Sequence, residues 1–154
     1  MSGVIRDAAG NLYGTAGGGT WDAGVVYKVT PSGQEEVLYA FTGGTDGGDP
    51  QAGVLQDPEG NLYGTTYSGG AHGAGAVYKL SPKGRESVLY SFTGGSDGGS
   101  PEAGVVRDAA GNLYGRLIPE GRAMAWCTSW MRPEMRRFST LLPLEATGSV
   151  LTVV

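Results

Sequence analysis

One sequence unit occurs nearly three times in this chain of 154 residues. The segment GVIRDAAGNLYGT from Gly3 recurs as GVLQDPEGNLYGT from Gly53 and as GVVRDAAGNLYG from Gly104. The second half of the unit, GVVYKVTPSGQEEVLYAFTGGTDGGDP from Gly24, recurs as GAVYKLSPKGRESVLYSFTGGSDGGSP from Gly75. Self-similarity at a fixed period is typical of repeat architectures, in which each unit packs against the next. We therefore divide the chain into repeat 1 (3–52), repeat 2 (53–103), the start of repeat 3 (104–115) and a non-repeat tail (116–154).

Each repeat predicts four short β-strands joined by turns. In repeat 1 the predicted strands are Gly3–Asp7, Asn11–Thr15, Val25–Thr30 and Glu36–Thr42. Asp7-Ala8-Ala9-Gly10 and Pro31-Ser32-Gly33 are turn sequences, because Asp accepts local backbone hydrogen bonds and Gly adopts positive φ. Alternation in the last strand places Val37, Tyr39 and Phe41 on one face and Leu38 and Ala40 on the other. Since both faces are apolar, we expect the strand to be covered on both sides.

Four strands in about 50 residues match a blade of a β-propeller. We predict an all-β protein of propeller-like, tandem four-stranded blades, about two and a half of them, with an irregular C-terminal tail. A β-sandwich is the competing interpretation, but a sandwich does not require nearly identical units.

Three motifs carry a resemblance to a known family. They are D-x-x-G-N-L-Y-G-T, G-x-V-Y-K-[LV]-x-P-x-G and V-L-Y-x-F-T-G-G-x-D-G-x-x-P. Residues 3–115 resemble the GloVer tandem repeat of bacterial choice-of-anchor repeat proteins. The resemblance implies a propeller-like fold, long tandem arrays, and a secreted or cell-surface location. It implies no particular activity.

Composition excludes several classes of function. The net charge of −4 and the isoelectric point near 4.9 argue against a nucleic-acid partner, which requires a basic surface. No apolar stretch is long enough to cross a membrane, and the first residues do not have the pattern of a signal peptide. A single Cys excludes an internal disulfide framework and a zinc site built on cysteines.

The tail differs abruptly from the repeats. Residues 1–115 hold 27 of the 29 Gly, whereas the tail holds the only Cys and three of the four Met. Reading across adjacent codons in a shifted frame, Met124-Ala125 must give Gly, Trp126-Cys127 must give Val, and Trp130-Met131 must give Asp. With synonymous codons chosen freely, 115–148 then resembles the segment TTYSGGAHGAGAVYKLSPKGRESVLYSFTGGSDG from Thr65. We hypothesise that the loss of one base near codon 115 put repeat 3 out of frame.

The alternative is that residues 116–154 are the native sequence, translated in the correct frame. Its Arg residues and its Trp126, Trp130 and Phe138 would then form a basic, aromatic surface for lipid headgroups or an acidic partner. Against this, three Pro interrupt any long amphipathic helix there.

The best metal candidates are two Gly-rich loops, Asp46-Gly47-Gly48-Asp49 and Asp97-Gly98-Gly99-Ser100. Asp46, Asp49 and Asp97 could offer oxygens to Ca²⁺, although the spacing fits no known calcium loop. The favoured interpretation is a tight turn between repeats. The turn aspartates Asp7, Asp57 and Asp108 are also expected to be structural. Trp21 lies in a loop without a Trp counterpart in repeat 2, and is the best candidate for ligand contact.

No catalytic or cofactor-binding constellation is visible. We predict a fragment of a non-catalytic repeat scaffold, secreted or at a cell surface, with an unknown ligand. A propeller-based hydrolase or lyase and a Ca²⁺-stabilised module are the alternatives, the former supported by fold analogy alone. The expected partners are further repeats of the same array, or other copies that associate through exposed strand edges.

Overall fold

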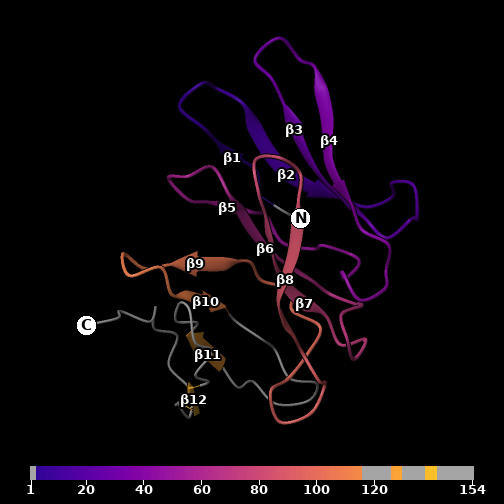
Figure 1. The fold of residues 1–154 in the computed structure, drawn as a ribbon, viewed down its shortest axis with the longest axis vertical. Helices are drawn as coiled ribbons and strands as arrows, with labels where there is room; N and C mark the ends of the chain where they lie inside the picture. Colours follow the sequence, from indigo (N-terminus) through magenta and orange to yellow (C-terminus); the bar gives the residue numbers. More distant parts are fainter. Residues whose placement is uncertain (1–2, 116–125, 130–137, 142–154) are drawn as a thin grey trace.

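The computed structural model describes residues 3–115, 126–129 and 138–141. Repeat 1 forms strands β1 (Ile5–Arg6), β2 (Leu12–Ala16), β3 (Val25–Val29) and β4 (Glu35–Ala40). Repeat 2 forms β5 (Leu55–Gln56), β6 (Leu62–Thr66), β7 (Ala76–Leu80) and β8 (Glu86–Ser91). Each set is an antiparallel sheet with its strands in chain order (Figure 1). The prediction of an all-β chain with four strands per repeat is confirmed.

Repeat 3 begins in the same way. Strands β9 (Val105–Arg107) and β10 (Leu113–Gly115) pair antiparallel. In the tail, for which we expected irregular backbone, β11 (Trp126–Ser129) and β12 (Phe138–Leu141) form a further antiparallel pair. The remainder of the tail, and with it most of the segment assigned to a shifted frame, lies outside the described residues. No helix in the described part of the chain could span a membrane.

The fourth strand of each complete repeat contains a bulge. Tyr39 lies opposite Val26 and Val37 lies opposite Tyr27, so Leu38 is an extra residue in β4. Strand β8 has the same irregularity at the same place. Because one inserted residue reverses the alternation of faces, Val37 lies on the opposite face from Tyr39 and Phe41. The predicted grouping of these three side chains on one face was therefore wrong, and Val37 is 54% exposed.

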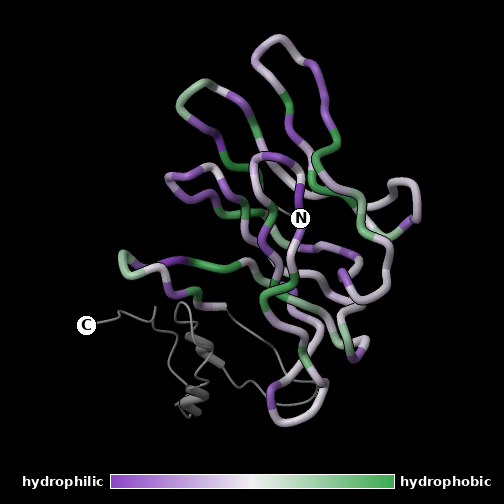
Figure 2. The backbone as a smooth tube through the Cα atoms, in the orientation of Figure 1, coloured by the Kyte–Doolittle hydropathy of each residue, from purple (hydrophilic) through white to green (hydrophobic). Residues whose placement is uncertain are grey.

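Successive sheets pack face to face, and each has two distinct faces. We call the face toward the preceding repeat the front face and the face toward the following repeat the back face. The first core joins the back face of repeat 1, through Val26 and Phe41, to the front face of repeat 2, through Val54, Leu62, Tyr78 and Leu80. The second core joins Tyr63, Val77 and Phe92 of repeat 2 to Val105 and Leu113 of repeat 3. The apolar segments of each repeat run along these strands, and polar residues gather in many of the outer turns (Figure 2).

The two cores use equivalent positions. Val26 and Phe41 correspond to Val77 and Phe92, and Leu62 corresponds to Leu113. Phe41 also meets Tyr78 edge to face, with ring centroids 5.0 Å apart. The sequence repeat is therefore a repeat of the interface as well as of the sheet.

Two glycines are required by close approaches. A Cβ on Gly64 would lie 2.5 Å from the hydroxyl of Tyr78, whose ring covers β6 on the front face. A Cβ on Gly53 would lie 2.5 Å from the carbonyl oxygen of Gly3, where repeat 2 approaches repeat 1. Only glycine leaves room for these contacts.

In each complete repeat, a threonine of the second strand bonds to the last residue of the same repeat. The buried hydroxyl of Thr15 donates to the carbonyl of Ala52 at 2.9 Å, and Thr65 donates to Ala103 at 3.0 Å. These bonds hold the segment that enters the next repeat. The two cores use equivalent residues, so repeat 2 packs on repeat 1 as repeat 3 packs on repeat 2.

Candidate functional site

The aspartates of the D-x-x-G-N-L-Y motif close the first turn of every repeat. In repeat 1 the Asp7 carboxylate accepts bonds from the backbone N–H of Asn11 at 2.8 Å, its side-chain amide at 2.8 Å and the Tyr13 hydroxyl at 3.0 Å. Asp57 and Asp108 make the same three bonds in their own repeats. The motif therefore encodes one turn, in agreement with the structural role predicted for these carboxylates.

These bonds also set the charge of the turn. The hydrogen bonds from Asn11 and Tyr13 favour the carboxylate and hold the pKa of Asp7 below its usual range, against a smaller opposing effect of burial. In Asp57 burial is the largest effect, but the bonds from Asn61 and Tyr63 outweigh it, and the pKa is again lowered. At neutral pH the turn aspartates are thus ionised hydrogen-bond acceptors.

The loop aspartates Asp46 and Asp97 close a second turn. Asp46 accepts the backbone N–H of Thr42 at 2.8 Å and the Tyr39 hydroxyl at 3.0 Å, together with the Thr42 hydroxyl. Asp97 has the equivalent partners, Thr93 and Tyr90. Burial disfavours both charges, but these bonds prevail and lower the pKa of each carboxyl.

The third calcium candidate, Asp49, lies apart from this arrangement. Its φ is 54°, its N–H donates to the carbonyl of Ala23, and its carboxylate accepts the side-chain amide of Gln51 at 3.1 Å. Ser100 takes the same positive φ and bonds to Ala74 in repeat 2. Within the described ranges, no group of three or more His, Cys, Asp or Glu side chains is placed to hold a metal ion. The loop geometry is that of a turn, in which all three candidate carboxylates accept hydrogen bonds.

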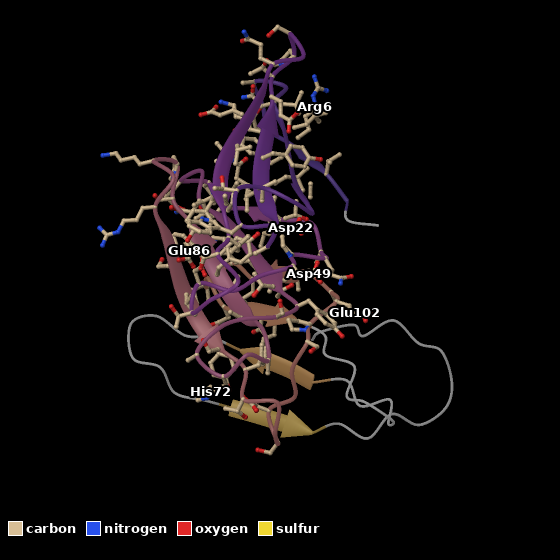
Figure 3. The ribbon with its side chains drawn as sticks, turned by 90° about the vertical axis from the view of Figure 1, so that its right-hand side faces the viewer. Arg6, Asp22, Asp49, His72, Glu86 and Glu102 are labelled. Atoms are coloured by element: carbon tan, nitrogen blue, oxygen red, sulfur yellow. The ribbon has the colours of Figure 1, made fainter. Side chains whose placement is uncertain are left out.

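Trp21 lies in the connection between β2 and β3 and is 63% exposed. His72 is exposed in the equivalent connection of repeat 2 (Figure 3). The Nζ of Lys28 lies 3.6 Å from Oε2 of Glu36. Lys79 lies instead over the ring of Tyr63, 5.6 Å from its centroid.

Seven of the eight tyrosines divide into three sets. One set bonds to the turn aspartates, and a second, Tyr39 and Tyr90, bonds to the loop aspartates. The third, Tyr27 and Tyr78, covers the glycine of the second strand. These side chains close turns or pack on the sheets, and Tyr78 also meets Phe41 of repeat 1.

The sequence analysis missed one cluster of polar groups, formed by Glu86 and Tyr78. Glu86, at the start of β8, pairs with Leu80 and shares the front face of repeat 2 with Tyr78 (Figure 3). In the described part of the chain, neither its buried Oε1 nor the buried hydroxyl of Tyr78 has a hydrogen-bond partner. Burial, and next the charge of Asp46 in repeat 1, raises the pKa of Glu86 to about 7. Burial and the nearby Glu86 also raise the pKa of Tyr78.

A sequence signal for this cluster did exist. Glu35 and Glu86 occupy the same position of the repeat, and each faces the last residue of the third strand. Glu35 is exposed because nothing among the described residues covers the front face of repeat 1. The position becomes half-buried only where a preceding repeat is present, which a single repeat cannot indicate.

Comparison with protein families identifies the repeat. The model of the Gloeobacter/Verrucomicrobia repeat matches residues 1–123. The chain belongs to this repeat family. The match includes both complete GloVer repeats and the start of the third, as the resemblance implied. No curated protein matches the chain.

Proposed function

We propose that this GloVer chain is a non-catalytic β-repeat scaffold, whose repeats stack in a propeller-like array and present loops to a ligand. The observation that carries this proposal is the repeated interface: Val26 and Phe41 pack on the front face of repeat 2 as Val77 and Phe92 pack on that of repeat 3. A chain whose buried apolar residues join each sheet to the next is suited to form an array of stacked repeats.

The close approach of the first strands supports a propeller-like array. The backbone of Gly53 lies against Gly3, and a Cβ on Gly104 would lie 3.1 Å from the carbonyl oxygen of Gly53. In a propeller the first strands of successive blades lie near a common axis while the outer strands diverge. Contacts between glycine backbones permit that crowding.

The bonding of the signature carboxylates supports a non-catalytic role. A propeller-based hydrolase or lyase would use acidic groups that converge from several repeats on one pocket. Asp7, Asp57 and Asp108 instead bond within their own turns, and so do the two loop aspartates. Their lowered pKa values are those of structural acceptors rather than of general acids, which require raised values.

The connection between the second and third strands is the proposed contact surface. Trp21 and His72 occupy the same position in consecutive repeats, and both are exposed. Exposed aromatic rings provide large contact area at low conformational cost. A glycan or another component of a cell surface is the class of ligand we propose, consistent with a secreted or surface location.

The test measures binding by the full chain and by a longer array of in-frame repeats to glycan arrays and to bacterial cells. Trp21→Ala should weaken binding about tenfold, whereas Val37→Ala, which removes an exposed apolar side chain outside the loop, should not. Failure of both proteins to bind on both surfaces would refute the scaffold's ligand role. Turnover of a glycan that is lost on substitution of the turn aspartates would favour the enzyme alternative.

A further inference from the structure

The loop that follows β4 (42–49) is bonded to the connection between β6 and β7 (67–75), in which His72 is exposed. Four backbone hydrogen bonds of 2.9–3.0 Å cross between the two repeats, with the donor named first: Gly48 to Ser68, Ser68 to Gly48, Tyr67 to Asp49 and Gly70 to Gly44. The approach is close, because a Cβ on Gly69 would lie 2.7 Å from the carbonyl oxygen of Gly44. The loop of repeat 1 therefore supports the backbone of the connection in repeat 2.

The shape of loop 42–49 is determined within repeat 1. The carboxylate of Asp46 accepts hydrogen bonds from Thr42 and Tyr39, and these bonds close the turn. Asp97 closes loop 93–100 of repeat 2 through the equivalent partners. Loss of the Asp46 carboxylate is therefore expected to loosen the loop without changing any residue of the connection.

We propose that Asp46 positions the contact surface of the next repeat: its turn shapes loop 42–49, and this loop holds the connection in which His72 is exposed. The inference rests on the ligand role proposed above for these connections. The contact surface of repeat 2 is then built by two repeats, because repeat 2 provides the exposed side chain and repeat 1 supports its backbone. A supported backbone loses less conformational freedom when a ligand binds, so the support favours binding.

The other end of the connection is held by repeat 2 itself. The N–H of Ser100 donates to the carbonyl of Ala74 at 2.7 Å, and the N–H of Ala71 donates to Oγ of Ser91 at 3.1 Å. Because Ser100 lies in the loop that Asp97 closes, Asp97 supports the end of the connection that Asp46 does not. The two aspartates make equivalent bonds in different repeats, so one provides the matched control for the other.

The test measures amide hydrogen exchange in the full chain, residue by residue by nuclear magnetic resonance and without any ligand. Asp46→Ala removes the bonds that close loop 42–49, so the N–H groups of Ser68 and Gly70 should exchange about tenfold faster. Asp97→Ala should leave these two amides unchanged. Tyr39→Phe removes only one of the bonds to Asp46 and should accelerate the same amides by a smaller factor, about threefold, with the circular dichroism of the wild type. Unchanged protection in both Asp46→Ala and Tyr39→Phe, or an equal loss in Asp97→Ala, would overturn the inference.

Glycan arrays distinguish this inference from the proposed function. For a glycan that the wild type binds, His72→Ala and Asp46→Ala should each weaken binding about fivefold. The double variant should bind no more weakly than the weaker single variant, because both changes act through the same connection. Effects that multiply would show that Asp46 acts independently of His72, and would overturn the positioning role. A wild type that binds no glycan would refute the proposed ligand role, whereas the exchange rates would still decide whether Asp46 supports the connection.

Discussion

The buried hydroxyl of Tyr78 permits a quantitative test of the interface between repeats 1 and 2. It lies on the front face of repeat 2 against Gly64, with no hydrogen-bond partner among the described residues. Replacing Tyr78 by Phe removes this group and leaves the ring on its edge-to-face contact with Phe41. Tyr27→Phe makes the same change at the equivalent, half-buried position of repeat 1, where the hydroxyl is not enclosed by another repeat.

The magnitude follows from the cost of burying an unpaired polar group. Such a group destabilises the folded state by about 1–3 kcal/mol. Removing the hydroxyl also removes its packing against β6, which offsets about 1 kcal/mol of that gain. We therefore expect Tyr78→Phe to raise the free energy of unfolding by about 1 kcal/mol, and Tyr27→Phe to change it by less than about 0.5 kcal/mol.

Urea denaturation followed by tyrosine fluorescence and far-ultraviolet circular dichroism measures both values. With a slope of about 1–3 kcal/mol per molar urea, the Tyr78→Phe midpoint should move upward by roughly 0.3–1 M. A loss of stability in Tyr78→Phe that exceeds the change in Tyr27→Phe would mean that the hydroxyl has a stabilising partner. That result would refute the assignment of an unpaired group to this interface.

Four further predictions concern the same repeats. Because the pKa of Glu86 is raised to about 7, its proton binds more tightly in the folded state, so unfolding free energy should rise as pH falls from about 7 toward about 4.5. Thermal melts at several pH values should show this rise, and Glu86→Gln, but not Glu35→Gln, should abolish it. Leu62→Ala should cost about 2–4 kcal/mol in urea denaturation, and Leu12→Ala about 1 kcal/mol or less. EDTA should leave the melting temperature unchanged, because the loop carboxylates already accept protein hydrogen bonds; a fall would restore the calcium hypothesis. Sequencing codons 110–154 and beyond should reveal a missing base followed by further in-frame repeats; an intact frame would contradict the frameshift hypothesis.

The number of strands in a complete repeat was predictable because the turns between them are encoded locally. The limits agree less well for the first strand, predicted as Gly3–Asp7 and observed as Ile5–Arg6. The predicted strand Val25–Thr30 and the observed β3 differ by one residue. The turn before β2 is determined by Asp7, Gly10 and Asn11, whose bonds all lie within the turn. Such contacts between near neighbours are visible in a sequence without any knowledge of tertiary structure.

The faces of the fourth strand were less predictable. A bulge at Leu38 reverses the alternation of side chains between the two faces after Val37. No residue type in β4 indicates this bulge in the sequence. The Glu86 cluster was missed for a related reason. Its raised pKa depends on Asp46 in the neighbouring repeat, a contact that depends on how two sheets pack.

The leucine of the segment GNLYG shows that the burial of a side chain depends little on the sequence of its own repeat. This leucine is 37% exposed as Leu12 and 3% exposed as Leu62, although the neighbouring letters and the turn bonds are the same. The difference arises from the sheet that lies in front, which is repeat 1 for Leu62 and no described residue for Leu12. The motif builds the same sheet each time, whereas the burial of its leucine depends on the interface between two repeats.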